Sequence, residues 1–168
     1  MARDRVLFQR GNDFRTLDSW GLVLCKAPIQ VMSSVKEPYK NEWPDEHGDE
    51  EWNESAYYEA YEADFTFAAK KDGYTYVANT VVSDIRDFIS WLNGGEFMFW
   101  CEYGNLGRQH VRYAGYDDDA EMWSMNTGRT ESHQRIVSTV LRFKLKLKVN
   151  DPVSRVVPNA TYTGLRVL

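Results

Sequence analysis

The longest alternating run in the sequence is Val140-Leu141-Arg142-Phe143-Lys144-Leu145-Lys146-Leu147-Lys148-Val149. Every second residue in it is apolar, so one face can enter a core while Arg142 and the three lysines stay in water. A helix would scatter these residues around its axis, because the helical period is 3.6 residues. The run therefore predicts a long strand of an antiparallel sheet with one buried face.

A second alternating stretch covers residues 61–69. Tyr, Ala and Phe side chains occupy one face of it, and Glu62 and Asp64 point to the other face. Antiparallel pairing of the two stretches would set these acids opposite lysines of the first run. Each such cross-strand charge pair stabilises a sheet by about 0.2–1 kcal/mol.

Between these strands, apolar residues at helical spacing predict one helix from about Val81 to Asn93. Asn79-Thr80 offers a capping oxygen at its start, and Gly94-Gly95 offers a left-handed stop at its end. The almost wholly apolar residues 96–103 predict a strand that is covered on both faces. Shorter strands are predicted at residues 20–24, 109–113 and 121–125, with a loop at 115–119 and a turn at 126–128.

The chain has 168 residues, a length that favours one domain with one core. Strands precede and follow a single helix, without repeated βαβ units. We therefore expect a mainly β fold with one α-helix, of the α+β class: an antiparallel β-sandwich or small barrel flanked by the helix. Residues 1–152 would form this domain. Residues 153–168 would form an extended C-terminal arm that packs on its own domain or adds to a neighbour's sheet edge.

Charge is distributed unevenly along the chain. Residues 41–69 contain ten acidic residues and no Lys or Arg, whereas residues 129–168 contain eight Lys or Arg and two acids. This polarity suits a subunit that repeats head to tail, because a positive face of one copy can meet a negative face of the next. The alternative is that the two segments neutralise each other within one fold.

The residue patterns of an active site are absent from the sequence. His47, His110 and His133 are isolated, and the acidic runs lack the spacing of a calcium loop. Cys25 and Cys101 have no CxxC spacing and no nearby His, so both are expected to be buried thiols. No nucleophile motif or phosphate-binding loop occurs. We therefore expect no enzymatic activity and no cofactor or metal, with a small metal-dependent enzyme as the least favoured reading.

Composition also narrows the range of partners. A net charge of −5 and a pI near 5.2 argue against sequence-specific nucleic-acid binding. A mean hydropathy of −0.56 argues against a membrane protein. The apolar run near the start, Val6-Leu7-Phe8, is too short for the core of a signal peptide.

The order of the features resembles a known family. A Trp20–Leu24 strand precedes Pro28, and Trp43-Pro44-Asp45-Glu46-His47-Gly48 precedes a strand ending in Phe65-Thr66-Phe67. The helix follows, and the final long strand ends in Asn150-Asp151-Pro152. Over about residues 14–152, this order resembles the N-terminal domain of distal tail proteins of long-tailed phages and, more broadly, the tail-tube and hub domains that share its fold. It leaves open which of these tail components the chain would be.

The resemblance implies a structural subunit that forms a ring, commonly a hexamer, around the tail channel or at the junction of tube and baseplate. Its partners would be copies of itself and other tail proteins. It would belong to the virion tail and assemble in the cytoplasm of the bacterial host. The expected interface residues are Asp45, Glu46, Asp49, Glu50 and Glu51 of the acidic loop and Arg142, Lys144, Lys146, Lys148, Tyr162 and Leu165 of the basic strand and arm.

The alternative function is a carbohydrate-binding β-sandwich module. Exposed aromatic rings can stack on sugars, and aromatics make up 14% of the chain. The candidates for such stacking are Trp43, Trp52, Tyr57 and Tyr58, beside the acidic loop.

Overall fold

The computed structural model describes residues 5–28, 33–37, 39–41, 50–52, 57–73, 77–133 and 135–168, with backbone alone for 39–41, 50–52, 77–79 and 118–119. The elements, in chain order, are β1 (Val6–Arg10), β2 (Asp13–Thr16), the 3₁₀ helix η1 (Leu17–Trp20), β3 (Leu22–Lys26), β4 (Tyr39–Asn41), β5 (Glu50–Trp52), β6 (Tyr61–Gly73), α1 (Val77–Leu92), β7 (Phe97–Cys101), the 3₁₀ helix η2 (Tyr103–Asn105), β8 (Leu106–Arg129), β9 (Arg135–Val149), β10 (Val156–Pro158) and β11 (Leu165–Val167).

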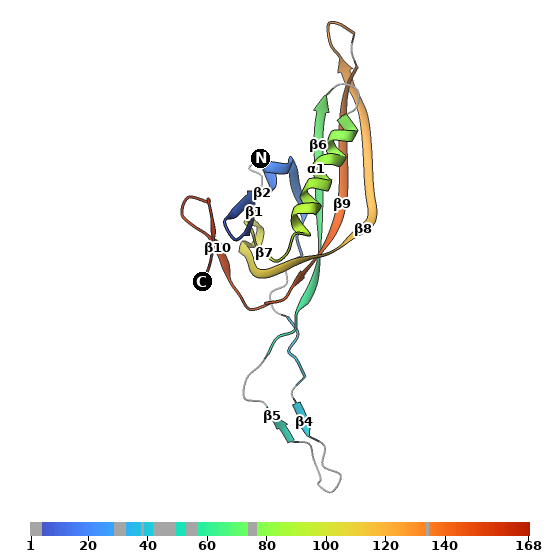
Figure 1. The fold of residues 1–168 in the computed structure, drawn as a ribbon. Coiled ribbons are helices and arrows are strands. Elements are labelled where there is room, and N and C mark those ends of the chain that lie inside the picture. Colours follow the sequence, from blue (N-terminus) through green and yellow to red (C-terminus); the bar gives the residue numbers. More distant parts are fainter. Residues whose placement is uncertain are drawn as a thin grey trace.

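Seven strands form one antiparallel sheet in the order β2-β1-β7-β8-β9-β6-β3 (Figure 1). The sheet curls strongly. Its edge strands β2 and β3 are joined directly by η1, and Phe65 of β6 lies 5.2 Å from Phe99 of β7, between ring centroids, although β8 and β9 separate the two strands in the sheet. The two halves therefore face each other across one core. Because β2 and β3 are not paired, the sheet is sandwich-like and does not close into a barrel. The predicted α+β class is confirmed.

The long alternating run forms β9 and pairs with β6 as predicted. Asp64 lies opposite Lys146, and Glu62 lies opposite Lys148. The apolar residues of β9 point to the core, where Phe143, Leu145 and Leu147 are almost fully buried.

Helix α1 begins at Val77, four residues before its predicted start, so Asn79-Thr80 lies inside the first turn and is not its cap. The Arg10 guanidinium stabilises the other end. It donates hydrogen bonds to the carbonyls of Trp91 at 2.6 Å, Leu92 at 3.3 Å and Gly95 at 3.1 Å. It also lies 4.4 Å from the centre of the Trp91 ring. A side chain of β1 thus satisfies helix carbonyls that have no partner within the helix.

Strand β7 is covered on both faces, as its composition predicts. Phe97, Phe99 and Cys101 belong to the main core, and Trp100 belongs to a second cluster with Leu7, Val156 and Leu165. Residues 153–168, predicted as an extended arm, contain the antiparallel pair β10–β11, which packs on its own chain. The contact is close at Gly107, where an added Cβ would lie 1.8 Å from the carbonyl oxygen of Val156. Only glycine fits this position.

The predicted strands at 109–113 and 121–125 are parts of one strand, β8. The predicted loop at 115–119 and the predicted turn at 126–128 are wrong, because both segments belong to the strand. Residues 115–117 pair with β9, and the pairing becomes irregular only between Asp117 and Glu121. The resulting β8–β9 hairpin projects from the curled body (Figure 1). The short β4–β5 pair lies at the opposite end of the molecule.

Candidate assembly surfaces

The part of the sheet that extends from the body is a three-stranded blade. We define the blade as residues 70–73 of β6, 135–141 of β9 and 120–129 of β8. Within it, β6 and β8 both pair with β9 and with no other described strand. The blade therefore has two unpaired strand edges, which natural proteins usually cover or pair.

One of these edges, which continues along β8 beyond the blade, is acidic and apolar. We call residues 115–129 of β8 the acidic edge. Its Asp117 and Glu121 side chains are exposed. Three large apolar side chains on it are also exposed: Met122 at 54%, Trp123 at 47% and Met125 at 66%. Exposed apolar residues on an unpaired strand mark a surface that can bind another chain.

The other edge, which continues from the blade into β3, is basic. We call β3 together with residues 70–73 of β6 the basic edge. Lys26, Lys70 and Lys71 on it are exposed. Lys70 Nζ lies 3.6 Å from an Asp72 carboxylate oxygen, and Lys71 Nζ lies 3.3 Å from Asp84 Oδ2 on α1.

The basic edge also carries Cys25. This thiol is exposed, contrary to the expectation of a buried one, whereas Cys101 is buried as expected. Partial burial raises the pKa of the Cys25 thiol, and the nearby charge of Arg142 opposes that shift. Cys25 therefore marks the basic edge with a group that reagents in solution can reach.

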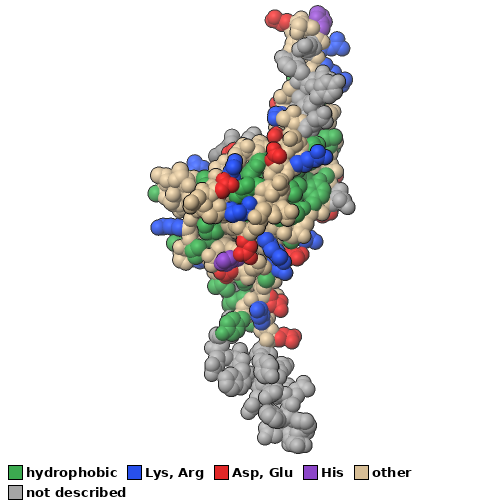
Figure 2. All heavy atoms as spheres, viewed as in Figure 1, with side chains coloured by type: hydrophobic (Ala, Val, Ile, Leu, Met, Phe, Trp, Pro, Cys, Tyr) green, Lys and Arg blue, Asp and Glu red, His purple; other side chains and the backbone are tan. Residues whose placement is uncertain are grey.

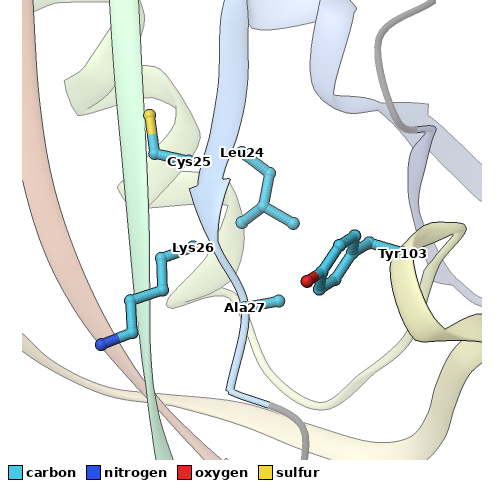
Figure 3. Close-up of a pocket in the computed structure, with 5 residues that line it drawn as sticks. All are labelled: Leu24, Cys25, Lys26, Ala27 and Tyr103. Carbon is cyan, nitrogen blue, oxygen red and sulfur yellow. The ribbon is translucent and has the colours of Figure 1, made fainter.

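A small pocket of about 200 Å³ lies beside β3. Leu24 of β3 and Ala27, just after the strand, face Tyr103 of η2 across it, while Cys25 and Lys26 point to the other side of the strand (Figure 3). The thiol and the ammonium group thus point away from the tyrosine hydroxyl. The pocket does not bring these groups together for catalysis.

The predicted basic residues lie in the middle of the sheet and not at an edge. Arg142, Lys144, Lys146 and Lys148 follow one face of β9, away from the core. On that face, Asp117 of β8 lies opposite Lys144, and Glu121 lies opposite Arg142. Together with Glu62 and Asp64 of β6, these residues give each member of the basic row one acidic neighbour inside the same chain, while Arg112 of β8 lies on the other side of Lys148.

The other predicted interface residues lie elsewhere. Tyr162 is partly exposed, with Arg5 stacked 4.4 Å from its ring centre. Leu165 is only 7% exposed and packs in its own chain. Asp45, Glu46 and Asp49 lie outside the described residues, and only the backbone is described for Glu50 and Glu51 in β5.

The aromatic residues of the carbohydrate-binding hypothesis are only partly described. Trp43 lies outside the described residues, and only the backbone of Trp52 is described. Tyr57 is 67% exposed, and Tyr58 forms an isolated bridge with Val35. The described residues therefore do not assemble an aromatic platform for sugars.

A groove lies between α1 and β8 on the core-side face of the sheet, opposite to the face that carries the basic row. Its volume is about 280 Å³, and its lining residues are Val82, Ile85, Arg86 and Ile89 of α1, Tyr116 of β8 and Leu141 of β9. Figure 2 shows hydrophobic side chains gathered where α1 and β8 face the viewer. Met122 lies directly opposite Leu141 and so extends the groove along β8.

Sequence reasoning missed both edges and the groove. One signal was present: Met122, Trp123 and Met125 place apolar side chains on both faces of a short strand. A strand with one buried and one solvated face would alternate. Apolar residues on both faces depart from this alternation, and in the structure all three stay largely exposed.

Two further features of the described chain bear on function. Among the described residues, no three His, Cys, Asp or Glu side chains are grouped closely enough to hold a metal ion. In the same part of the chain, no helix is both long enough and apolar enough to span a bilayer.

No protein-family model matches the chain, and no curated protein matches its sequence. Among solved structures, the chain is similar to SPP1 Dit (gp 19.1), described as a paradigm of the hub adsorption apparatus in phages that infect Gram-positive bacteria. The TM-score is 0.49 and the identity 11%, over 94% of this chain and 59% of that one. The chain thus spans about three fifths of the length of that protein. The likeness is one of chain path, and no residue takes a role from it.

Proposed function

We propose that the chain is a structural subunit of a phage tail that assembles head to tail, through its acidic and basic edges, into an oligomeric ring. One observation carries the proposal: a single subunit presents two unpaired strand edges with opposite charge. The two edges are different surfaces, so their contact is heterologous. A heterologous contact repeats from copy to copy and closes into a ring when the rotation allows it.

The strand directions permit this addition. Strands β8 and β3 run in opposite directions, because three antiparallel pairings separate them in the sheet. The β8 edge of one copy can therefore continue the sheet into β3 of the next as an ordinary antiparallel pair. Asp117, Lys144, Thr66 and Lys26 lie opposite one another across the four strands. Addition without stagger would set Asp117 of one copy beside Lys26 of the next.

Backbone pairing and apolar burial, rather than charge, would hold such a ring together. An exposed ion pair contributes about 0–1 kcal/mol and is screened by salt. Each backbone hydrogen bond of the new ladder contributes about 0.5–1.5 kcal/mol, and burial of apolar area adds about 25 cal/mol per Å². The charges would set which edges meet and in what register. The assembly should therefore persist at high salt and form more slowly there.

The order of sequence features supports placement in a phage tail, through its resemblance to the distal tail and tail-tube domains. On this proposal the ring is a tube, distal tail or hub component, with six copies as the first number to test. Its partners are its own copies and other tail proteins, it assembles in the host cytoplasm, and it needs no cofactor.

Light scattering on the purified chain and on charge-reversed variants tests the proposal. Lys26→Glu and Asp117→Lys should each weaken the assembly, because each sets like charges side by side. The double variant should recover the wild-type state. A wild type that stays monomeric at high micromolar concentration, or a double variant weaker than both single variants, would contradict edge pairing.

A further inference from the structure

The groove between α1 and β8 is open at the unpaired edge of β8. Tyr116 and Met122 lie on the core-side face of β8, opposite Leu145 and Leu141. Even so, Tyr116 is 40% exposed and Met122 is 54% exposed. The helix packs mainly on β6 and β9, so it covers one side of the groove and leaves β8 only partly covered.

In the next copy, η1 lies beside β3, the strand that would pair with β8 of the first copy. It directly precedes β3 and packs on the core side of the sheet, where the Trp20 ring lies 5.0 Å from Phe88 and 5.6 Å from Trp91. A continued sheet keeps its core-side face on the same side. The next copy's η1 would therefore arrive on the same face as the groove, immediately beyond β8.

The spacing leaves room for one row of side chains. Helix α1 lies over the middle of the β6–β9 pair, and η1 of the next copy lies beside its β3. The distance between these two positions is between two and three strand spacings, or about 10–14 Å at roughly 4.8 Å each. Two helices in direct contact lie about 8–10 Å apart. The remaining gap of a few ångströms suits side chains that rise from β8 between the two helical elements, which are those of Tyr116 and Met122.

The charges at the two sides also match. Arg86 is exposed at the rim of the groove on α1. In the 3₁₀ helix η1, Asp18 is the exposed acidic residue of the first turn. An arginine on the groove and an aspartate on the arriving element favour this partner and this orientation.

Building on the proposed edge pairing, we propose that the α1–β8 groove of one copy is a docking site for η1 of the next copy, with Arg86 facing Asp18. The docked η1 covers Tyr116 and Met122. The groove is thus a second contact of the same interface, made by side chains on the core-side face.

Oxidation of two methionines in one strand tests the docking. In dilute monomer, Met122 and Met125 are both open to hydroxyl radicals. In the assembly, η1 should protect Met122 several-fold, while Met125, whose side chain points to the opposite face, should react much as before. Peptide mass spectrometry of residues 113–129 distinguishes the two sites, so each sample contains its own control.

Charge exchange supplies a second readout. Arg86→Glu and Asp18→Arg should each raise the concentration needed for assembly about fivefold, the effect expected of an exposed ion pair. The double variant should restore it. Asp87→Arg is the matched control, because Asp87 is an exposed acid next in sequence to Arg86 that does not line the groove.

The outcomes separate the two proposals. Protection of Met122 with recovery in the double variant supports the docking. An assembly in which Met122 and Met125 oxidise equally, or in which the double variant does not recover, overturns the docking and leaves edge pairing in place. A wild type that remains monomeric overturns both.

Discussion

The body and the blade bury their apolar residues to very different extents. In the body, Phe8 is fully buried and its ring centre lies within 5.5–6.0 Å of five other aromatic rings. In the blade, about half of the Trp123 surface and about two thirds of the Met125 surface are exposed. The body is a complete core that one chain supplies, whereas the blade presents apolar side chains that its own chain leaves uncovered. The contrast indicates that the body sets the stability of the fold, and under the proposed function the blade serves contact with other copies.

The sharpest test of this contrast removes one aromatic ring from each region. Phe8→Ala should lower the free energy of unfolding by about 3–5 kcal/mol, because it empties the centre of the aromatic cluster. Trp123→Ala should change it by less than about 0.5 kcal/mol and weaken assembly instead. Chemical denaturation and light scattering on both variants measure the two effects. Equal losses of stability would show that the blade is part of the folding core.

A second prediction concerns the link between β1 and the end of α1. Arg10→Ala should cost about 1.5–3 kcal/mol, the range for hydrogen bonds made by a charged group, because three carbonyls each lose the hydrogen bond from the guanidinium. Arg10→Lys should recover little, since an ammonium group cannot reproduce the planar fork over Trp91. Thermal unfolding of the three proteins checks this. Full recovery by lysine would mean that the positive charge alone matters.

A third prediction compares two glycines of β8. Gly107→Ala should cost about 1–3 kcal/mol and loosen residues 153–168, because the new methyl group meets the backbone of Val156. Gly115→Ala should be nearly neutral, since nothing lies within 4 Å of its added Cβ. Hydrogen exchange of the C-terminal residues reads out the difference. Unchanged protection in Gly107→Ala would show that the hairpin does not depend on this contact.

The smallest expected effect depends on pH. Hydrogen bonds from His110 and Asn150 lower the pKa of Glu96. A carboxyl group whose pKa is lower in the folded state contributes stability above its unfolded pKa of about 4.3, and this contribution is lost as the pH falls through the folded value. Glu96→Gln should therefore flatten the acid side of the stability curve slightly. Identical curves for both proteins between neutral and acidic pH would contradict this assignment.

The sequence predicted those parts of the fold that depend on local pattern. The alternation in β9 and β6 was sufficient to predict two half-buried strands, and their opposite charges favoured the pairing that the structure shows. The unbroken apolar run of β7 was sufficient to predict cover on both faces. The strands β1 and β2 were missed, because Val6-Leu7-Phe8 is short and carries no alternation. The start of α1 was misplaced because Asn79-Thr80 looks like a cap, whereas the helix begins before it.

The candidate surfaces could not be predicted in the same way, because an edge is a property of the whole sheet. Whether β8 or β3 is unpaired depends on which strands lie beside it, and those strands are distant in sequence. The basic row of β9 was conspicuous in the sequence and was predicted to be an interface. The register gives each of its residues an acidic neighbour of its own chain, so its role as an interface stays a prediction, and the proposed function uses the two edges.

A disulfide between copies tests the central claim of edge pairing most directly. Ala120 of β8 is exposed, and it lies between Asp117, which is opposite Lys144, and Glu121, which is opposite Arg142. Cys25 of β3 lies at the same level of the sheet. Within one chain the two positions are three strand spacings apart, about 14 Å, whereas a disulfide needs Cα atoms within about 7 Å. Any bond between them must therefore join two copies.

Three single variants place a cysteine on this edge: Ala120→Cys, Asp117→Cys and Glu121→Cys, the last two to allow for stagger between copies. Each variant protein is oxidised gently in the assembled state and then separated by electrophoresis under denaturing, non-reducing conditions. Edge pairing predicts a ladder of cross-linked species that stops at the number of copies in the ring. The ladder should disappear when Cys25→Ser is added, and Ala160→Cys on the C-terminal hairpin should give none. An assembled protein that forms no ladder through Cys25 from any of the three edge positions would contradict the account.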